Sequence, residues 1–141
     1  MNYSIFFLLV GIIILGLILI SFVFISSNKK GIHKLDVEKY RVKYLEIENN
    51  LKKDDDLSYH MTIINADKLL DQALKDIGFS GSTMAERLKS ANSKFKNNNK
   101  VWNVHKLRNR IVHEQNVVLT YRDCEIALLS FKEALKDLGA I

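Results

Sequence analysis

The segment from residue 102 to residue 114 holds the side chains that could do chemistry. Its sequence, WNVHKLRNRIVHE, brings imidazole, carboxamide and guanidinium groups close together along the chain. A histidine can exchange a proton near neutral pH, an arginine can bind a phosphate through two N–H groups, and an amide can orient either partner. This combination suits the cleavage of a phosphodiester bond.

A helix over this segment would sort its side chains onto two stripes. Apolar side chains within about 60° of one another predict the buried stripe, namely Val104, Leu107 and Ile111. Polar and aromatic side chains fall on a second stripe about 140° away, namely Trp102, His105, Asn109 and His113. Arg108 lies between the stripes and is long enough to run along the apolar edge and reach the polar one.

A metal site is not expected in this segment. His105 and His113 would be about 12 Å apart along the helix axis, too far for two ligands of one zinc ion. Cys124 is the only cysteine, so the chain has no internal disulfide and no cysteine-based zinc site. A lone thiol in a helix predicts a packed residue rather than a nucleophile. The sequence predicts no cofactor and no metal.

Asp67 and Asp71 are the other carboxylates of interest, because they lie one helical turn apart. They could pair as acids or bind a cation, but the neighbouring Lys68 and Lys75 favour an exposed helix face. A purely structural interpretation of the 102–114 segment also stays open. In that case its polar groups are hydrogen-bonded within the bundle, and Arg108 pairs with an acid such as Asp67.

The positive charge of the chain is concentrated in one stretch. The net charge is +5, and residues 87–113 carry eight basic side chains and no acidic one. Such a stretch can be a solvated face, a contact with anionic lipid or a contact with RNA phosphates. The candidate RNA-binding residues are Arg87, Lys89, Lys94, Lys96, Lys100, Trp102, His105, Lys106 and Arg110. Trp102 could stack a base, although a packed position is the commoner one for tryptophan.

Residues 5–25 form an apolar stretch without a charged side chain. As a helix it would be about 31 Å long, close to the roughly 30 Å of a bilayer core, so the sequence predicts a transmembrane anchor over residues 1–28. A cleaved signal peptide would need a basic start and a shorter apolar run. Lys29, Lys30 and Lys34 follow the stretch and predict a single-pass membrane protein with its C-terminal domain in the cytoplasm.

The rest of the chain is expected to be all-α, because it lacks proline and shows helical apolar spacing. Helices are predicted over residues 35–53, 57–77, 83–95 and 100–114, with a last one after Thr120. Asp54–Asp56, Gly78 and Thr83 with Glu86 are the expected caps. Residues 29–56 are interpreted as a juxtamembrane linker with an amphipathic helix, which could pack on its own domain or pair with a second copy. Residues 57–141 would form the helical bundle.

The sequence Arg108-Asn109-x-x-x-His113 resembles the R-N-x-x-x-H motif of the HEPN superfamily, and the resemblance extends over residues 57–138. It includes the run 66–70 (ADKLL), the segment 81–89 with ERL at 86–88, residues 102–105 just before the motif, and a last helix after a short loop. The resemblance implies a small helical bundle of four to five helices that forms a homodimer. It also implies a metal-independent endoribonuclease in which motif residues of two protomers converge.

By position, the resemblance makes Arg108 and His113 the residues that act on the phosphate and the 2′-hydroxyl, and Asn109 the residue that orients them. The partners it implies are a second copy, RNA, and an antitoxin or other regulatory protein. The competing class is a non-catalytic, membrane-tethered interaction or dimerisation module.

Overall fold

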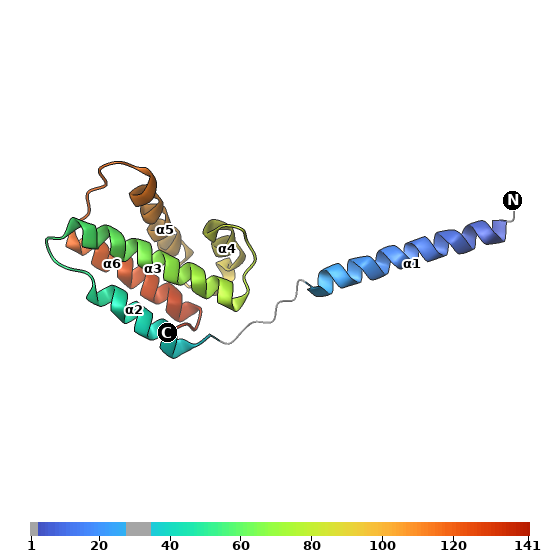
Figure 1. The fold of residues 1–141 in the computed structure, drawn as a ribbon, viewed down its shortest axis with the longest axis horizontal. Helices are drawn as coiled ribbons and strands as arrows, with labels where there is room; N and C mark the ends of the chain where they lie inside the picture. The colour runs from blue at the N-terminus through green and yellow to red at the C-terminus, as the bar shows by residue number, and fades with distance from the viewer. Residues whose placement is uncertain (1–2, 28–34) are drawn as a thin grey trace. The chain divides into compact units, whose positions relative to one another are not determined.

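The computed structural model describes residues 3–27 and 35–141; within the first range, side chains are described for residues 3, 7 and 10–21. These residues form helices and no strand (Figure 1), so the predicted all-α class is confirmed. The helices are α1 (Tyr3–Ser27), α2 (Val37–Asn49), α3 (Asp56–Ile77), α4 (Met84–Ser90), the 3₁₀ helix η1 (Asn92–Lys94), α5 (Asn98–His113) and α6 (Tyr121–Asp137). The chain divides into two compact units, Met1–Gly31 and Ile32–Ile141.

Helix α1 has 25 residues and contains no acidic or basic side chain. Its described isoleucines and leucines are exposed, with Ile12 at 59% and Leu19 at 57%. Among the residues that the structure describes, no helix reaches the length and apolarity needed to cross a membrane. This finding gives no support to the span predicted over residues 5–25. The three lysines predicted to set the topology lie in 28–34, outside the described residues.

The ends of α3 follow from local chemistry, as the sequence predicts. The Asp55 carboxylate accepts a hydrogen bond from the backbone N–H of Ser58 at 2.9 Å, which satisfies one of the free donors of the first turn. Gly78 ends the helix with φ 100°, a left-handed conformation that costs glycine little. These two caps fix the length of the helix on which the site is built.

The predicted Thr83–Glu86 cap forms only in part. Thr83 Oγ1 accepts from the Glu86 N–H at 3.2 Å, but the Glu86 carboxylate accepts from the N–H of Ser82 instead of returning to Thr83. At the start of α6 both halves of the box are present, because Thr120 and Asp123 each accept a bond from the other's backbone N–H.

Several helix boundaries differ from the sequence prediction: the helix expected over residues 35–53 spans only Val37–Asn49, and two further differences have a local cause. The expected helix 83–95 stops at Ser90. After the short helix η1, the backbone of Phe95 is extended, and its ring is buried in the core. The asparagine run 97–99 was expected to be a loop. Instead the Asn97 side chain accepts from the N–H of Lys100 at 3.1 Å, so α5 begins at Asn98.

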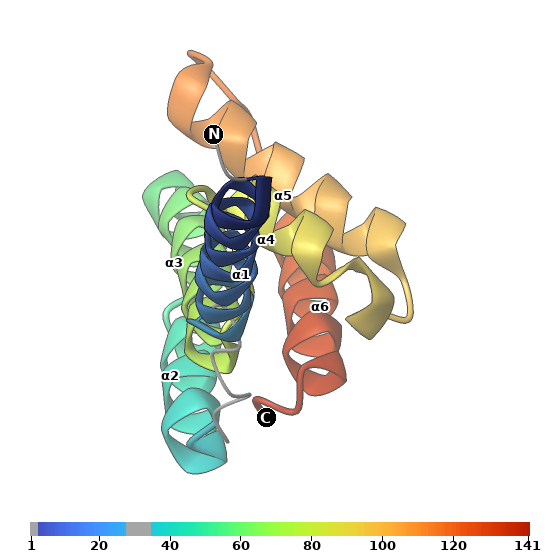
Figure 2. The same cartoon turned by 90° about the vertical axis from the view of Figure 1, so that its right-hand side faces the viewer.

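Helix α3 is the central element of the second unit and packs against α2, α4, α5 and α6. Helices α2, α3 and α6 run alongside one another, and α5 crosses α3 and α6 at a steep angle (Figures 1 and 2). The largest fully buried side chains of α3 are Ile63, Leu70 and Leu74, which meet Phe131 and Leu135 in one core. The crossing brings the middle of α5 against the middle of α3.

Helix α2 belongs to this bundle, which confirms the first of its two predicted alternatives. Tyr40 and Tyr44 are buried in the core. The Tyr40 hydroxyl donates to Asp76 at 2.7 Å, and the Tyr44 hydroxyl donates to the carbonyl of Leu128 at 3.0 Å. Burial raises the pKa of both phenols. The bundle therefore begins before residue 57, and the predicted boundary at 56/57 cuts through it.

Candidate functional site

Four polar side chains meet where α5 crosses α3. His105 Nδ1 lies 3.0 Å from Asp67 Oδ1, and His105 Nε2 lies 3.3 Å from the amide nitrogen of Asn109. Arg108 Nη1 donates to Asn109 Oδ1 at 3.1 Å. Arg108 Nε lies 3.4 Å from Asp67 Oδ2, so the four side chains form a closed ring of contacts. We call Asp67, His105, Asn109 and Arg108 the polar ring.

The inner half of the polar ring is cut off from water. Asp67 is 3% exposed and His105 is 6% exposed. Burial raises the pKa of the Asp67 carboxyl, although the hydrogen bond from His105 and the charge of Arg108 oppose that rise. A buried carboxylate is tolerated only when partners replace its water, and the ring supplies them.

Arg108 reaches from the interior to the surface. Its Nε is buried and makes no hydrogen bond, so the contact with Asp67 is an ion pair only. Its side chain keeps 26% of its surface exposed. Nη2 bonds to no described residue, and it is not fully buried. The guanidinium is thus anchored on its inner side, and its outer N–H groups are open to an anion.

The placement of His105 corrects the sequence prediction. The imidazole was expected on the exposed polar stripe as an RNA contact, but it is buried together with Val101 and Val104. The side of α5 that carries His105 faces α3, where Asp67 provides a hydrogen-bond partner for the buried imidazole. Leu107 and Ile111, which were expected to be buried, are only partly covered.

The expected exposed face at Asp67 and Asp71 is also wrong. Asp67 is buried in the polar ring, and Asp71 accepts two bonds from Arg87, at 2.7 Å to Nε and 3.0 Å to Nη2. The alternative in which Arg108 pairs with Asp67 is confirmed. Sequence reasoning missed the Asp67–His105 pair. The available signal was that Asp67 lies on the same helical face as Ile63, Leu70 and Leu74, within about 60° of each.

Arg87 forms a second buried ion pair, one turn along α3 from the ring. It is 6% exposed, and it also donates from Nη1 to the carbonyl of Gly81 at 2.5 Å. Burial alone would raise the pKa of Asp71, but the hydrogen bonds and charges of Arg87 and Lys75 outweigh it and lower that pKa. All three guanidinium nitrogens are committed within the bundle, so Arg87 cannot serve as the surface RNA contact that the sequence predicts.

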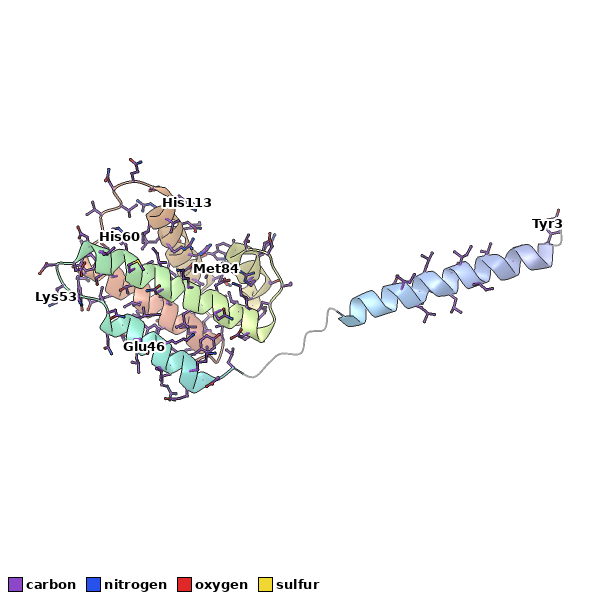
Figure 3. All side chains as sticks on the ribbon, viewed as in Figure 1. Tyr3, Glu46, Lys53, His60, Met84 and His113 are labelled. Atoms are coloured by element: carbon purple, nitrogen blue, oxygen red, sulfur yellow. The ribbon has the colours of Figure 1, made fainter. Side chains whose placement is uncertain are left out.

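His113 is not part of the polar ring. It is the last residue of α5, and Figure 3 shows it at the outer end of that helix. Its side chain is exposed, and it has no hydrogen bond or ion pair with a described residue. Five positions after Arg108, it points about 140° away around the helix. Within one chain the structure joins Arg108 and Asn109, whereas His113, one helical turn beyond Asn109, makes no hydrogen bond or ion pair with either.

Six of the predicted RNA contacts lie on the surface. These exposed side chains are Lys89, Lys94, Lys96, Lys100, Lys106 and Arg110. Half of them have an acidic partner: Lys96 with Asp137, Lys100 with Glu133, and Arg110 with Glu114. Lys89, Lys94 and Lys106 form no ion pair with a described residue. Trp102 is half-buried and stands edge-on to His105, with ring centres 6.2 Å apart.

A surface hollow of about 300 Å³ lies at the start of α5, away from the ring. Lys96 and Lys100 line it, but so do their partners Asp137 and Glu133. Lys136 also lines it, so three lysines face two acidic side chains, and the hollow has little excess positive charge for an anion.

Among the residues that the structure describes, the polar ring has neither a reactive thiol nor a metal-binding cluster beside it. Cys124 is fully buried, and burial raises the pKa of its thiol to about 11, which confirms that it is a packed residue. In residues 3–27 and 35–141, no group of three or more histidine, cysteine or acidic side chains is arranged to hold a metal ion.

Comparison of the chain with protein-family models, with curated proteins and with solved structures finds no match. The resemblance to the HEPN superfamily therefore stays a prediction that rests on Arg108, Asn109, His113 and the residues around them.

Proposed function

We propose that the chain is a membrane-anchored, HEPN-like protein that binds RNA and cleaves it without a metal. The observation that supports this most is the polar ring, which holds Arg108 and Asn109 side by side with the outer N–H groups of the guanidinium free. Three of the four ring residues, His105, Arg108 and Asn109, lie in the stretch 87–113, which carries eight basic side chains and no acidic one. A fixed arginine in such a stretch suits a phosphate ligand.

The proposed reaction uses the 2′-hydroxyl of RNA as its nucleophile. His113 removes the proton of that hydroxyl, the 2′-oxygen bonds to phosphorus, and the P–O5′ bond breaks. The products are a 2′,3′-cyclic phosphate and a 5′-hydroxyl, whose proton comes back from the histidine or from water. Arg108 stabilises the extra negative charge on the phosphate, and Asn109 orients the reacting groups.

The reaction as proposed needs a second copy of the chain. Within one chain His113 makes no hydrogen bond or ion pair with Arg108 or Asn109, and the family resemblance implies that motif residues of two protomers converge. A twofold homodimer can place His113 of one protomer near Arg108 of the other. Attachment to one membrane would favour this pairing by raising the effective concentration of copies.

The flanking phosphates of the RNA are assigned to lysines that have no acidic partner among the described residues, namely Lys89, Lys94 and Lys106. Such contacts release counterions, so the affinity for RNA should fall as the salt concentration rises. Lys96, Lys100 and Arg110 contribute less in this proposal, because each is already paired.

The membrane anchor is proposed from the sequence. Residues 5–25 carry no charged side chain, and three lysines follow within residues 29–34. Helix α1 passes through this stretch as one continuous helix. The proposal puts the bundle in the cytoplasm. Reporter fusions at the C-terminus test it: a reporter that is active only outside the cytoplasm, or release of the chain by an alkaline carbonate wash, would contradict the anchor.

The test of the proposed function is a cleavage assay with the full-length chain in detergent micelles and excess EDTA. Arg108→Ala and His113→Ala should each lower the rate of RNA cleavage at least a hundredfold. Gln115→Ala is the matched control, because Gln115 is exposed just beyond the motif and should keep the wild-type rate. Loss of cleavage in EDTA, or equal cleavage by all three variants, would contradict the proposal.

A second candidate function is a non-catalytic interaction or dimerisation module, including a docking platform for a regulatory protein. The observation that favours it is the internal pairing of the ring, in which His105, Arg108 and Asn109 each already have a partner in the chain. A folded dimer that neither binds nor cleaves RNA would support this candidate.

A further inference from the structure

The direction of the hydrogen bonds in the polar ring is fixed by what each group can donate or accept. Arg108 has only N–H donors, so the Asn109 atom that faces its Nη1 has to be the carbonyl oxygen Oδ1. The amide nitrogen Nδ2 of Asn109 then faces His105 Nε2 at 3.3 Å. Since that nitrogen donates, His105 Nε2 has to accept and cannot carry a proton.

The same reasoning fixes the other side of His105. A neutral imidazole whose Nε2 accepts carries its proton on Nδ1, which donates to the Asp67 carboxylate at 3.0 Å. A proton on Nε2 would set two donors against each other at Asn109. Turning the Asn109 amide round would move the same conflict to Arg108. One assignment alone satisfies every contact of the ring.

The neighbouring pair of Asp71 and Arg87 shows what the polar ring does differently. Arg87 uses Nε and Nη2 on Asp71 and Nη1 on a backbone carbonyl, so every nitrogen of its guanidinium is bound inside the bundle. Arg108 makes one hydrogen bond, to Asn109, and one ion pair, to Asp67, and its Nη2 is left outside. The Arg87–Asp71 pair therefore only joins two helices, whereas the polar ring leaves part of the Arg108 guanidinium open to a ligand.

We propose that Asp67 and His105 are positioning residues, which hold Arg108 and Asn109 in the orientation that a phosphate of RNA requires. Asp67 holds the inner side of the guanidinium by charge. His105 holds the Asn109 amide, whose carbonyl in turn holds Nη1. An arginine fixed in this way loses little freedom when an anion binds. The assignment rests on the proposed function of Arg108 and adds two residues that the motif does not contain.

The wild-type chain allows a direct test of the ring. In nitrogen-15 NMR spectra of the full-length chain in detergent micelles at neutral pH, His105 should show a protonated Nδ1 and an unprotonated Nε2. This measurement needs no variant and no RNA. A His105 that carries its proton on Nε2, or on both nitrogens, would overturn the assignment.

Variants then test whether the ring holds Arg108. Asp67→Asn keeps the shape of the side chain but removes its charge, so hydrogen exchange of the Arg108 Nε–H should speed up at least tenfold. Asp71→Asn is the matched control, one turn along the same helix and paired with Arg87. It should change the Arg108 exchange rate less than twofold. Equal exchange in Asp67→Asn and in the wild type would overturn the proposal.

The cleavage assay separates this proposal from the proposed function. Asp67→Asn should lower kcat at least tenfold and change KM less than threefold, because the surface lysines still bind RNA while Arg108 is misplaced. Asp71→Asn should keep both constants within threefold. Equal loss of kcat in both variants would mean a general structural effect and overturn the proposal. A wild-type chain that cleaves no RNA would contradict the proposed function, whereas the NMR data would still decide the geometry of the ring.

Discussion

Asp67 Oδ1 and His105 Nδ1 lie 3.0 Å apart inside the bundle, although one residue comes from the middle of α3 and the other from the middle of α5. The pair is the inner support of Arg108 and Asn109, and it also joins two helices that cross. Both side chains are almost fully buried. The contact therefore has consequences for stability as well as for the proposed chemistry.

Removing one partner of this pair should destabilise the fold strongly. Asp67→Ala leaves the Arg108 charge and the His105 Nδ1–H without their acceptor, and breaking a buried ion pair in this way costs about 3 to 5 kcal/mol. The free energy of unfolding from urea titration measures the loss. Asp56→Ala is the control, because Asp56 is exposed in the first turn of the same helix and should cost less than about 1 kcal/mol. Similar losses in both variants would contradict the paired, buried state of Asp67.

Truncating a core side chain should lower the free energy of unfolding more than truncating an exposed one. Leu70→Ala on α3 removes a fully buried side chain and should lower the free energy of unfolding by about 2 to 5 kcal/mol. Leu129→Ala on α6 removes a side chain that is 55% exposed and should cost less than about 1 kcal/mol. A larger loss for Leu129 than for Leu70 in urea titration would contradict the described packing, or would show that a partner covers Leu129.

The pH dependence of stability should differ in sign between the two carboxylates of α3. The folded-state pKa of Asp71 is lowered, so its contribution is present above its unfolded pKa of about 4 and is lost as the pH falls through the folded value. The folded-state pKa of Asp67 is raised, so the folded state holds its proton more tightly. Its contribution falls as the pH rises from about 4 through the folded value.

Urea midpoints measured from pH 2.5 to pH 7 test these signs. Asp71→Asn should reduce the loss of stability below pH 4. Asp67→Asn should reduce the loss of stability that occurs as the pH rises above about 4. Asp36→Asn is the control for an exposed carboxylate. Should Asp71→Asn steepen the acid loss, the assigned direction of its pKa would be wrong.

The thiol of Cys124 should be nearly inert in the folded chain. Its pKa is raised to about 11, so only a very small fraction is thiolate at pH 8, and the side chain has no exposed surface. Labelling with a disulfide reagent should therefore be at least a hundredfold slower in buffer than in denaturing urea. Fast labelling without denaturant would show that α6 opens readily or that Cys124 is not buried.

The sequence predicts those features of the fold that depend on neighbouring residues. The cap at Asp55, the end of α3 at Gly78 and the cap at Thr120 each need only a few positions of local sequence, and all three are confirmed. The polar ring depends on how α5 crosses α3. Helical periodicity assigns faces by polarity, so His105 and Asp67 were expected at the surface. In the structure each of them gives the other the hydrogen-bond partner that replaces water on burial.

Dimerisation through the site predicts complementation between two inactive variants. In a mixture of Arg108→Ala and His113→Ala chains, about half of the dimers should be mixed. Each mixed dimer has one site with Arg108 from one chain and His113 from the other. Cleavage should therefore recover to about a quarter of the wild-type rate. A mixture as inactive as its components would contradict a site shared between two copies.

The most direct test of the central claim uses RNA with a single 2′-deoxy nucleotide at the mapped cleavage position. The full-length wild-type chain with excess EDTA should cleave the all-ribose strand and leave the substituted strand intact at that position. His113→Ala should cleave neither strand while its helical content and dimerisation are unchanged. Cleavage of the 2′-deoxy strand at the wild-type rate, or cleavage by His113→Ala, would contradict a metal-independent attack by the 2′-hydroxyl at this site.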